Sequence, residues 1–402
     1  MSRARLSAII GNFLEHYDTA LFGFVAPFIA PLFFPESTPL TALILTYGML
    51  PLGIVTRPLG ALFFGWIGDK YGRRQALFYS LLGMAMVTMG MGSLPFYPLL
   101  LALGRMLQSF CAAGESIGGA IFVLENTKAT KRDLMSSLYD VSSIGGILTA
   151  SLLVSTLSRL GSFETSWRIL FWCGGLTALL GFFLRLGIKD TPECLITQET
   201  PPPFSLKEKS YLLLPIIFAS GFSYVTYSLA FTLMNGYIPL ITPFLREEVI
   251  EANTGLLVLD LLLLPCFGYL AQRIGKEKVM LFGTVGAVLG AIPLFASLSG
   301  ASLGTIFLVR LLLIVCGVAF AAPYHSWSLE RVPLEYRYRV LSLGSALGSQ
   351  LIGAPATVIC LGLYQLTGWH GAPSLYLIAT GLLASVTIYQ NKGLFKRPAE
   401  GY

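Results

Sequence analysis

Long apolar runs fill most of the chain, and short polar or basic stretches separate them. Twelve runs can be marked, at about residues 6–34, 40–67, 75–94, 98–124, 135–159, 166–188, 211–240, 252–271, 278–298, 302–325, 340–365 and 371–391. Each is long enough for a helix that crosses about 30 Å of hydrocarbon, which takes roughly 20 apolar residues. They are apolar nearly all round, whereas a soluble helical protein needs a polar face on most helices. The pattern predicts an all-α integral membrane protein with twelve transmembrane helices, the first of which is not a cleavable signal peptide.

Composition and charge agree with this prediction and add an orientation. Only 12% of the 402 residues are charged, against roughly 25% in an ordinary soluble domain. Of the 27 Lys and Arg residues, 21 lie at the termini and at connections on one side of the predicted membrane. Three (Arg159, Arg168 and Arg246) lie on the other side. Basic loops favour the cytoplasm, so both termini are predicted to be cytoplasmic, at a plasma membrane such as the bacterial inner membrane. The net charge of +6 is then an orientation signal, and no nucleic-acid partner is predicted.

A repeat at half the chain length divides these helices into two sets. The loop at 65–74 reads GWIGDKYGRR and the loop at 268–277 reads GYLAQRIGKE, with both glycine pairs offset by 203 residues. The predicted organisation is a six-helix bundle at 1–188, a Pro-rich cytoplasmic linker at 189–210 and a second six-helix bundle at 211–402. Two pseudo-symmetric halves with a polar site between them are typical of alternating-access transporters.

The loop at 65–74 resembles the signature loop of the major facilitator superfamily. Four further stretches resemble its metabolite:proton symporter branch, which includes proline/betaine transporters and carriers of citrate, 2-oxoglutarate and shikimate: GNFLEHYDTALFGF at 11–24, RPLG at 57–60, Arg105–Gln108 through Glu115, and Trp167–Arg168. The resemblance covers essentially the whole chain. It implies proton-coupled symport of a small metabolite, either a proline- or betaine-like zwitterion or an organic acid.

Residues of the first signature loop are expected to form a conformational latch. Gly65 and Gly72 permit close helix approach and a tight turn, and Asp69 can meet a helix N-terminus or a basic side chain. Arg73 is predicted to pair with Glu125; alternatively, these charges serve only topology and turns. In the second loop Gln272 replaces the aspartate, so a comparable ionic latch is not expected there. Because the tail after Asn391 is short, the coiled coil of some osmosensing members of this branch is not expected.

Buried charges within the spans are candidates for proton coupling. At 1.5 Å per residue, Glu15, Arg57, Glu115 and Asp260 come out at a similar depth, roughly 13–16 Å from the cytoplasmic end. Ionised groups at such depth are costly and usually face a cavity or a partner. Two carboxylates that share a site raise each other's proton affinity, so Glu15, Asp18 and Glu115 are proton-coupling candidates. The alternative is permanent pairing with arginines for helix packing. His16 is predicted to be a structural hydrogen bonder.

A second set of residues is predicted to line the substrate cavity. It comprises the charged residues Arg57, Arg105, Asp260 and Arg310 and the uncharged residues Tyr17, Tyr224, Tyr227, Phe231 and Asn235. Four acidic against three basic groups suit a zwitterion, or an anion that travels with a proton. Aromatic faces can hold an ammonium group while an arginine takes a carboxylate, although aromatic stripes also serve packing.

Other functions remain open at this stage. A carboxylate carrier or an exporter of the same fold is one alternative, although the fifth span has Gly145 and Gly146 but lacks the Gly-Pro signature of drug/proton antiporters. A non-transporting sensor is another, although it would be expected to lose its buried charges. The sequence contains no phosphate-binding loop, metal-ligand cluster or nucleophile triad, so an enzyme, a cofactor or a metal is not predicted. The expected partners are a small molecule, protons and the lipid bilayer, and the protein is expected to be a monomer.

Overall fold

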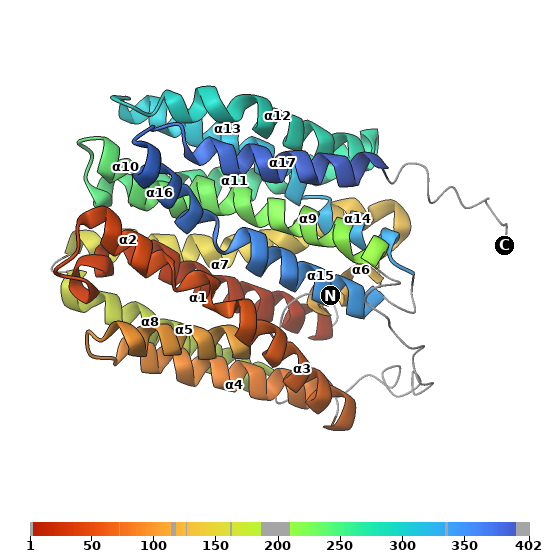
Figure 1. Ribbon diagram of the computed structural model, residues 1–402. Helices are drawn as coiled ribbons and strands as arrows, with labels where there is room; N and C mark the ends of the chain where they lie inside the picture. The colour runs from red at the N-terminus through yellow and green to blue at the C-terminus, as the bar shows by residue number, and fades with distance from the viewer. Residues whose placement is uncertain are drawn as a thin grey trace, which may run out of the picture.

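The computed structural model describes residues 3–71, 73–113, 118–125, 127–160, 163–185, 210–333 and 337–390, and these residues form helices joined by short connections (Figure 1). The first six apolar runs become α1 (Arg3–Phe33); α2 (Pro39–Tyr47), η1 (Leu50–Leu52) and α3 (Gly53–Tyr71); α4 (Arg73–Gly92); α5 (Pro98–Ala112) and α6 (Gly118–Glu125); η2 (Ala129–Lys131) and α7 (Arg132–Leu160); and α8 (Phe163–Arg185).

The last six runs become α9 (Ser210–Tyr227), η4 (Ser228–Leu233) and α10 (Met234–Ile241); α11 (Arg246–Ile274); α12 (Lys276–Ala296); α13 (Leu303–Ala321) and α14 (Tyr324–Arg331); α15 (Arg337–Gly348), η5 (Ser349–Gly353) and α16 (Ala356–Thr367); and α17 (Pro373–Gln390). Each predicted run therefore contains helix, and the all-α, twelve-span architecture is confirmed. Within the described residues, seven helical segments are long and apolar enough to cross a membrane on their own. Nearly all of the predicted linker at 189–210 lies outside the described residues.

Several spans are interrupted near proline, which lacks a backbone N–H and clashes with the preceding turn. The second span breaks at Gly48 and Pro51, and the tenth breaks at Pro323 between α13 and α14. Two spans instead contain a turn of wider π-helix, η4 in the seventh and η5 in the eleventh. Such turns redirect side chains and occur frequently at functional sites. Both of these turns border the cavity described below.

The two halves meet along α7 and α11, which pack against each other in antiparallel directions. Near one end, a Cβ on Gly268 would lie 2.0 Å from the hydroxyl of Ser137, so only glycine allows this close approach. Near the other end, the hydroxyls of Ser151 and Thr254 are hydrogen bonded at 2.8 Å. The second signature loop therefore begins at a tight contact between the halves.

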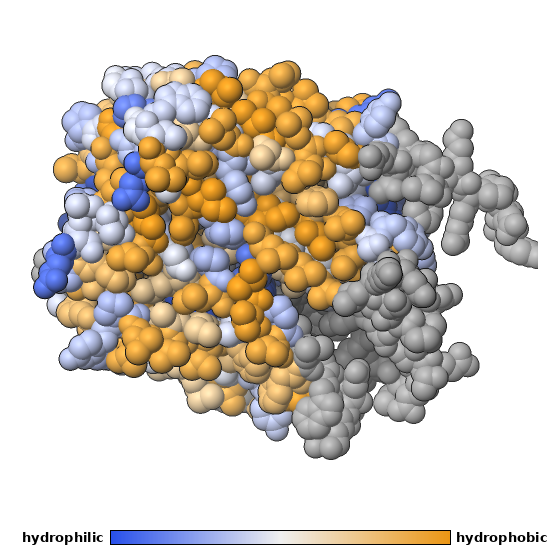
Figure 2. All heavy atoms as spheres, in the orientation of Figure 1, coloured by the Kyte–Doolittle hydropathy of each residue, from blue (hydrophilic) through white to orange (hydrophobic). Residues whose placement is uncertain are grey.

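The outer surface suits a lipid environment. Figure 2 shows a broad hydrophobic surface along the helices, with hydrophilic residues toward both ends of the visible face. Large apolar side chains such as Val55, Met86, Leu289 and Leu366 point outward. The inner helices α1 and α7 pack closely, whereas α4 with α8 and α12 with α17 form pairs within each half. The protein is a multi-pass membrane protein whose charged side chains are concentrated in its interior and at its ends.

Candidate functional site

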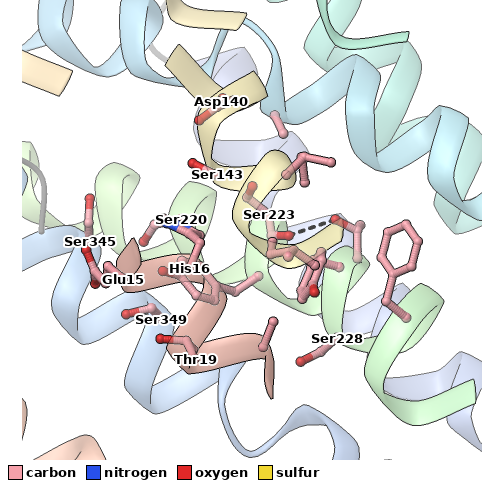
Figure 3. A pocket seen from close by; sticks show the side chains of 18 of the residues that line it. Glu15, His16, Thr19, Asp140, Ser143, Ser220, Ser223, Ser228, Ser345 and Ser349 are labelled. Atoms are coloured by element: carbon pink, nitrogen blue, oxygen red, sulfur yellow. Dashed lines mark hydrogen bonds between the residues drawn. The ribbon is translucent and has the colours of Figure 1, made fainter. Parts of the chain in front are cut away.

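A cavity of about 290 Å³ lies between the two halves. Its wall is formed by α1, η1, α3, α5, α6 and α7 from the first half and by α9, η4, α11, α13, α14, α15 and η5 from the second. Figure 3 shows polar side chains converging on it from α1 (Glu15, His16, Thr19), α7 (Asp140, Ser143), α9 and η4 (Ser220, Ser223, Ser228), and α15 and η5 (Ser345, Ser349). Small-molecule sites typically measure roughly 300–1,000 Å³, so this cavity suits a small solute.

Glu15 and Arg57 form a buried ion pair at the cavity wall. The guanidinium Nη2 of Arg57 donates a hydrogen bond of 2.5 Å to Oε1 of Glu15, and the two residues are 8% and 5% exposed. Tyr224 from the other half lies close enough to interact electrostatically with both. The pair explains how the first span tolerates Glu15, because a buried carboxylate needs a partner.

Asp18 is joined to Arg105 by a chain of hydrogen bonds. Thr88 donates to Oδ2 of Asp18 at 2.8 Å, and Nε2 of Gln108 donates to the hydroxyl of Thr88 at 3.0 Å. Arg105 in turn donates to Oε1 of Gln108, and its guanidinium lies 4.5 Å from the ring centre of Phe22. Arg105 and Gln108 line the cavity, whereas Asp18 is buried just behind its wall. Asp18 therefore interacts with Arg105 mainly through intermediates.

Asp260 stands apart from the other buried carboxylates. It is 4% exposed and lines the cavity, yet it forms no hydrogen bond or ion pair with any described residue. The rings of Tyr227 and Phe231, one helical turn apart, lie beside each other with centroids 5.1 Å apart, and both line the same cavity. Tyr227 is close enough to Asp260 to interact electrostatically, and its buried hydroxyl has no hydrogen-bond partner.

Three residues that were predicted to line the cavity do not line it: Tyr17, Asn235 and Arg310. Tyr17 donates a 3.1 Å hydrogen bond to the carbonyl of Leu170 between α1 and α8. Arg310 is fully buried and donates to the backbone carbonyls of Ala230 and Val249, and to the side chains of Asn235 and Asn253. Because Ala230 lies in η4, Arg310 braces the π-turn that carries Phe231 toward the cavity.

The end of the molecule that carries the basic loops also carries polar contacts between the halves. His325 of α14 lies 3.1 Å from Asp140 of α7, and Arg337 donates a 2.9 Å hydrogen bond to Glu125. Lys276 lies 3.1 Å from Asp133. Glu125 thus pairs with the other half of the molecule. Lys276, four residues after Gln272 in the second signature loop, gives that loop an ionic contact with the first half.

Several predicted positions lie where the structure describes no side chain. Gly65 and Asp69 are in α3 and Arg73 begins α4, but their side chains are outside the described set; Gly72 and Glu115 lie outside the described residues altogether. His16 makes the predicted structural contact, with its Nδ1 2.8 Å from the carbonyl oxygen of Asn12. The described residues contain no group of three His, Cys, Asp or Glu side chains arranged to hold a metal ion.

Sequence reasoning missed the uncharged partners and the cytoplasmic contacts. Thr88, Gln108 and Asn253 connect buried charges, but a lone Thr or amide in an apolar run carries no sequence signal of its own. Asp140 and His325 are 185 residues apart in the chain, and only the packing of α7 against α14 joins them.

Comparisons with known proteins agree with this architecture. Residues 4–200 match the family described as sugar (and other) transporter. The proline/betaine transporter of Salmonella typhimurium is 28% identical over an alignment that covers 100% of this chain and 85% of the relative. The glycine betaine/proline/ectoine/pipecolic acid transporter OusA of Dickeya dadantii is also 28% identical, over 99% of this chain and 83% of the relative.

Solved structures give the same fold at lower sequence identity. A D-xylose–proton symporter superposes with a TM-score of 0.77 at 16% identity, covering 96% of this chain and 97% of the other. The partially occluded, inward-open xylose transporter XylE of E. coli gives 0.74 at 15% identity, covering 97% and 98%. The protein is a membrane transporter, not an enzyme, with the fold of the major facilitator superfamily. The resemblance to proline/betaine transporters indicated by the sequence motifs is confirmed.

Proposed function

We propose that the protein is a secondary active transporter that couples the uptake of a small zwitterionic metabolite to protons moving down their gradient. The observation that carries this proposal is the central cavity, which is lined by charged side chains from both halves. A solute bound there contacts both halves, so their relative movement can expose it to one side of the membrane and then the other. The relatives' names, which include proline and glycine betaine, support a zwitterion of that size.

Proton coupling is assigned to the carboxylates of the first span, with Asp18 as the leading candidate. Glu15 is held by Arg57 in a buried ion pair, so it already has a counter-charge. Asp18 lacks a direct arginine partner, and its Oδ1 has no hydrogen-bond partner. Thr88 and Gln108 link Asp18 to Arg105 by hydrogen bonds. Protonation of Asp18 can therefore alter the hydrogen bonding of Arg105 in the cavity wall. Glu115 remains a candidate from the sequence.

The first signature loop and the contacts at the same end of the molecule are assigned to conformational control. Asp133, Asp140 and Glu125 of the first half meet Lys276, His325 and Arg337 of the second. These contacts must break when the halves separate at this end, which we assign to the cytoplasmic side together with both termini. Asp69 and Arg73 are proposed to act in the same switch.

Uptake into proteoliposomes tests the proposed function. With an acidic exterior, labelled proline or glycine betaine is expected to accumulate above the external concentration, and a protonophore should abolish the accumulation. Citrate and 2-oxoglutarate serve as the comparison for an organic-acid carrier. Accumulation of these acids alone would favour the carboxylate carrier, and uptake that is indifferent to the protonophore would contradict proton symport.

A further inference from the structure

The two walls of the cavity carry opposite charge that is not neutralised within the protein. On the first half, Arg57 is committed to Glu15, whereas Arg105 forms no ion pair with any described carboxylate. Asp140, also on the first half, is engaged by His325 of the second half, whereas Asp260 of the second half has no partner among the described residues. One cation and one anion are therefore left facing a shared space.

Arg105 retains capacity to bind an anion. Its Nη1 donates to Gln108, but its buried Nε–H has no hydrogen-bond acceptor. A guanidinium offers five donors in a planar fork that fits a carboxylate. The ring of Phe22, 4.5 Å from the guanidinium carbon, holds the plane in place without using its donors. Arg105 is thus an oriented, incompletely satisfied donor in the cavity wall.

Asp260 and its aromatic neighbours have the opposite character. A buried carboxylate without a counter-charge costs several kcal/mol, and neighbouring groups normally supply that charge. Here the neighbouring Tyr227 has an unpartnered hydroxyl, and its ring pairs with that of Phe231 to form an apolar face. A carboxylate beside two aromatic rings suits an alkylated ammonium group, because the carboxylate supplies charge and the ring faces contact the methyl or methylene groups.

We propose that Asp260, with Tyr227 and Phe231, binds the cationic nitrogen of the transported molecule, and that Arg105 binds its carboxylate. This inference rests on the proposed function and adds the orientation and recognition of the substrate. The zwitterion bridges the halves, since its carboxylate binds α5 and its ammonium binds α11 and the α9–η4 segment. Each end of the zwitterion therefore pairs with a charged side chain that has no counter-charge in the protein. A molecule with only one of the two charges would leave either Arg105 or Asp260 unpaired.

Matched ligands test this assignment through equilibrium binding to the purified full-length protein in nanodiscs. Glycine betaine is compared with 3,3-dimethylbutanoate, which replaces the nitrogen by carbon, and with choline, which lacks the carboxylate. Proline is compared in the same way with cyclopentanecarboxylate and pyrrolidine. For the wild type, at least one zwitterion is expected to bind at least about tenfold more tightly than both of its matched analogues.

Variants then assign each end of the ligand. Asp260→Asn is expected to reduce the preference for the zwitterion over the analogue without a cation to less than about threefold, while the preference over the analogue without a carboxylate persists. Arg105→Gln should show the converse. Glu251→Gln is the matched control, since it neutralises a carboxylate on the same helix α11 that pairs with Arg159 away from the cavity lining; it should retain both preferences. Because Asp260→Asn removes an unpaired buried charge, its thermal midpoint is not expected to fall.

Two results would overturn the inference. Unchanged ligand preferences in Asp260→Asn, with only the proton-driven accumulation lost, would make Asp260 a proton site. A wild type that binds the analogues without a cation as tightly as the zwitterions would remove the cation site. If the analogues without a cation are then taken up in a proton-driven manner, proton symport stands and only this inference fails. If no compound shows proton-driven uptake, the proposed function itself is contradicted.

Discussion

At the scale of single residues, the buried charges differ in how completely the protein satisfies them. Glu15 forms an ion pair with Arg57, and Asp18 accepts a hydrogen bond from Thr88, which in turn accepts one from Gln108. Asp260 has no partner among the described residues. The depth of a charged residue in the membrane can be predicted from its position along a helix, so the sequence can predict which charges lie at a similar depth. Pairing cannot, because it depends on which helices meet: Arg57 is 42 residues from Glu15.

Breaking the buried pair should be more costly than removing it. Arg57→Gln strands Glu15 and is expected to lower stability by about 3–5 kcal/mol, as is usual when one partner of a buried pair is lost. Glu15→Gln combined with Arg57→Gln removes both charges and should recover much of that loss. Thermal unfolding of the purified single and double variants measures the coupling. Simple additivity of the two single losses would mean that the ion pair contributes nothing.

Neutralising Asp18 should separate exchange from uphill transport. Asp18→Asn resembles the protonated side chain, so accumulation driven by a proton gradient should collapse by at least about tenfold, whereas exchange of labelled for unlabelled substrate should survive. Tyr17→Phe is a suitable control, because it removes the neighbouring hydroxyl without changing a charge. If Asp18→Asn keeps gradient-driven uptake with an unchanged pH profile, the coupling site lies elsewhere, with Glu15 and Glu115 next to be tested.

At the scale of elements, the long apolar runs were predictable and their interruptions only partly so. Proline at 51 and 323 signals a break in the sequence, and helices do end there. The π-turns η4 and η5 could not be predicted, because they depend on tertiary contacts such as the hydrogen bond of 3.0 Å from Arg310 to the carbonyl of Ala230. This hydrogen bond also explains a charge that the sequence analysis assigned to the cavity.

Gly268 should be indispensable for the contact between α7 and α11. Gly268→Ala places a methyl group 2.0 Å from the hydroxyl of Ser137, so the helices must move apart, at a cost of about 1–3 kcal/mol typical of overpacking. Adding Ser137→Gly should relieve the clash. Transport rate and thermal midpoint are measured for both proteins, with Gly255→Ala on the same helix as a control, because its added carbon would meet only Phe307, at 4.0 Å. Equal behaviour of the Gly268 and Gly255 variants would contradict this packing.

At the scale of the whole molecule, the polar contacts at the proposed cytoplasmic end hold the two halves together on that side. The all-α fold with its two pseudo-symmetric halves could be predicted from the repeat and the apolar pattern. The cross-half contacts did not, because Asp133 and Lys276 are brought together only by the assembled bundle.

Weakening the polar contacts between the halves at the proposed cytoplasmic end should favour the state that is open to the cytoplasm. Asp133→Asn removes the first-half carboxylate that pairs with Lys276 across the two halves. It is expected to speed alkylation of a cysteine introduced at Ser345 in the cavity wall, by about threefold to tenfold, in inside-out vesicles. Glu251→Gln, which breaks a contact with Arg159 at the opposite end, should not accelerate it. Equal alkylation rates in the wild type and both variants would show that these contacts do not control opening.

The most direct test of proton symport measures whether inward transport of the substrate carries protons into liposomes. Liposomes containing the purified protein and a pH-sensitive dye are prepared with equal pH inside and outside, and with the membrane potential clamped. Addition of external proline or glycine betaine is expected to acidify the interior in the wild type and not in Asp18→Asn. If labelled substrate enters the wild-type liposomes without any acidification, the protein is not a proton symporter and the account is contradicted.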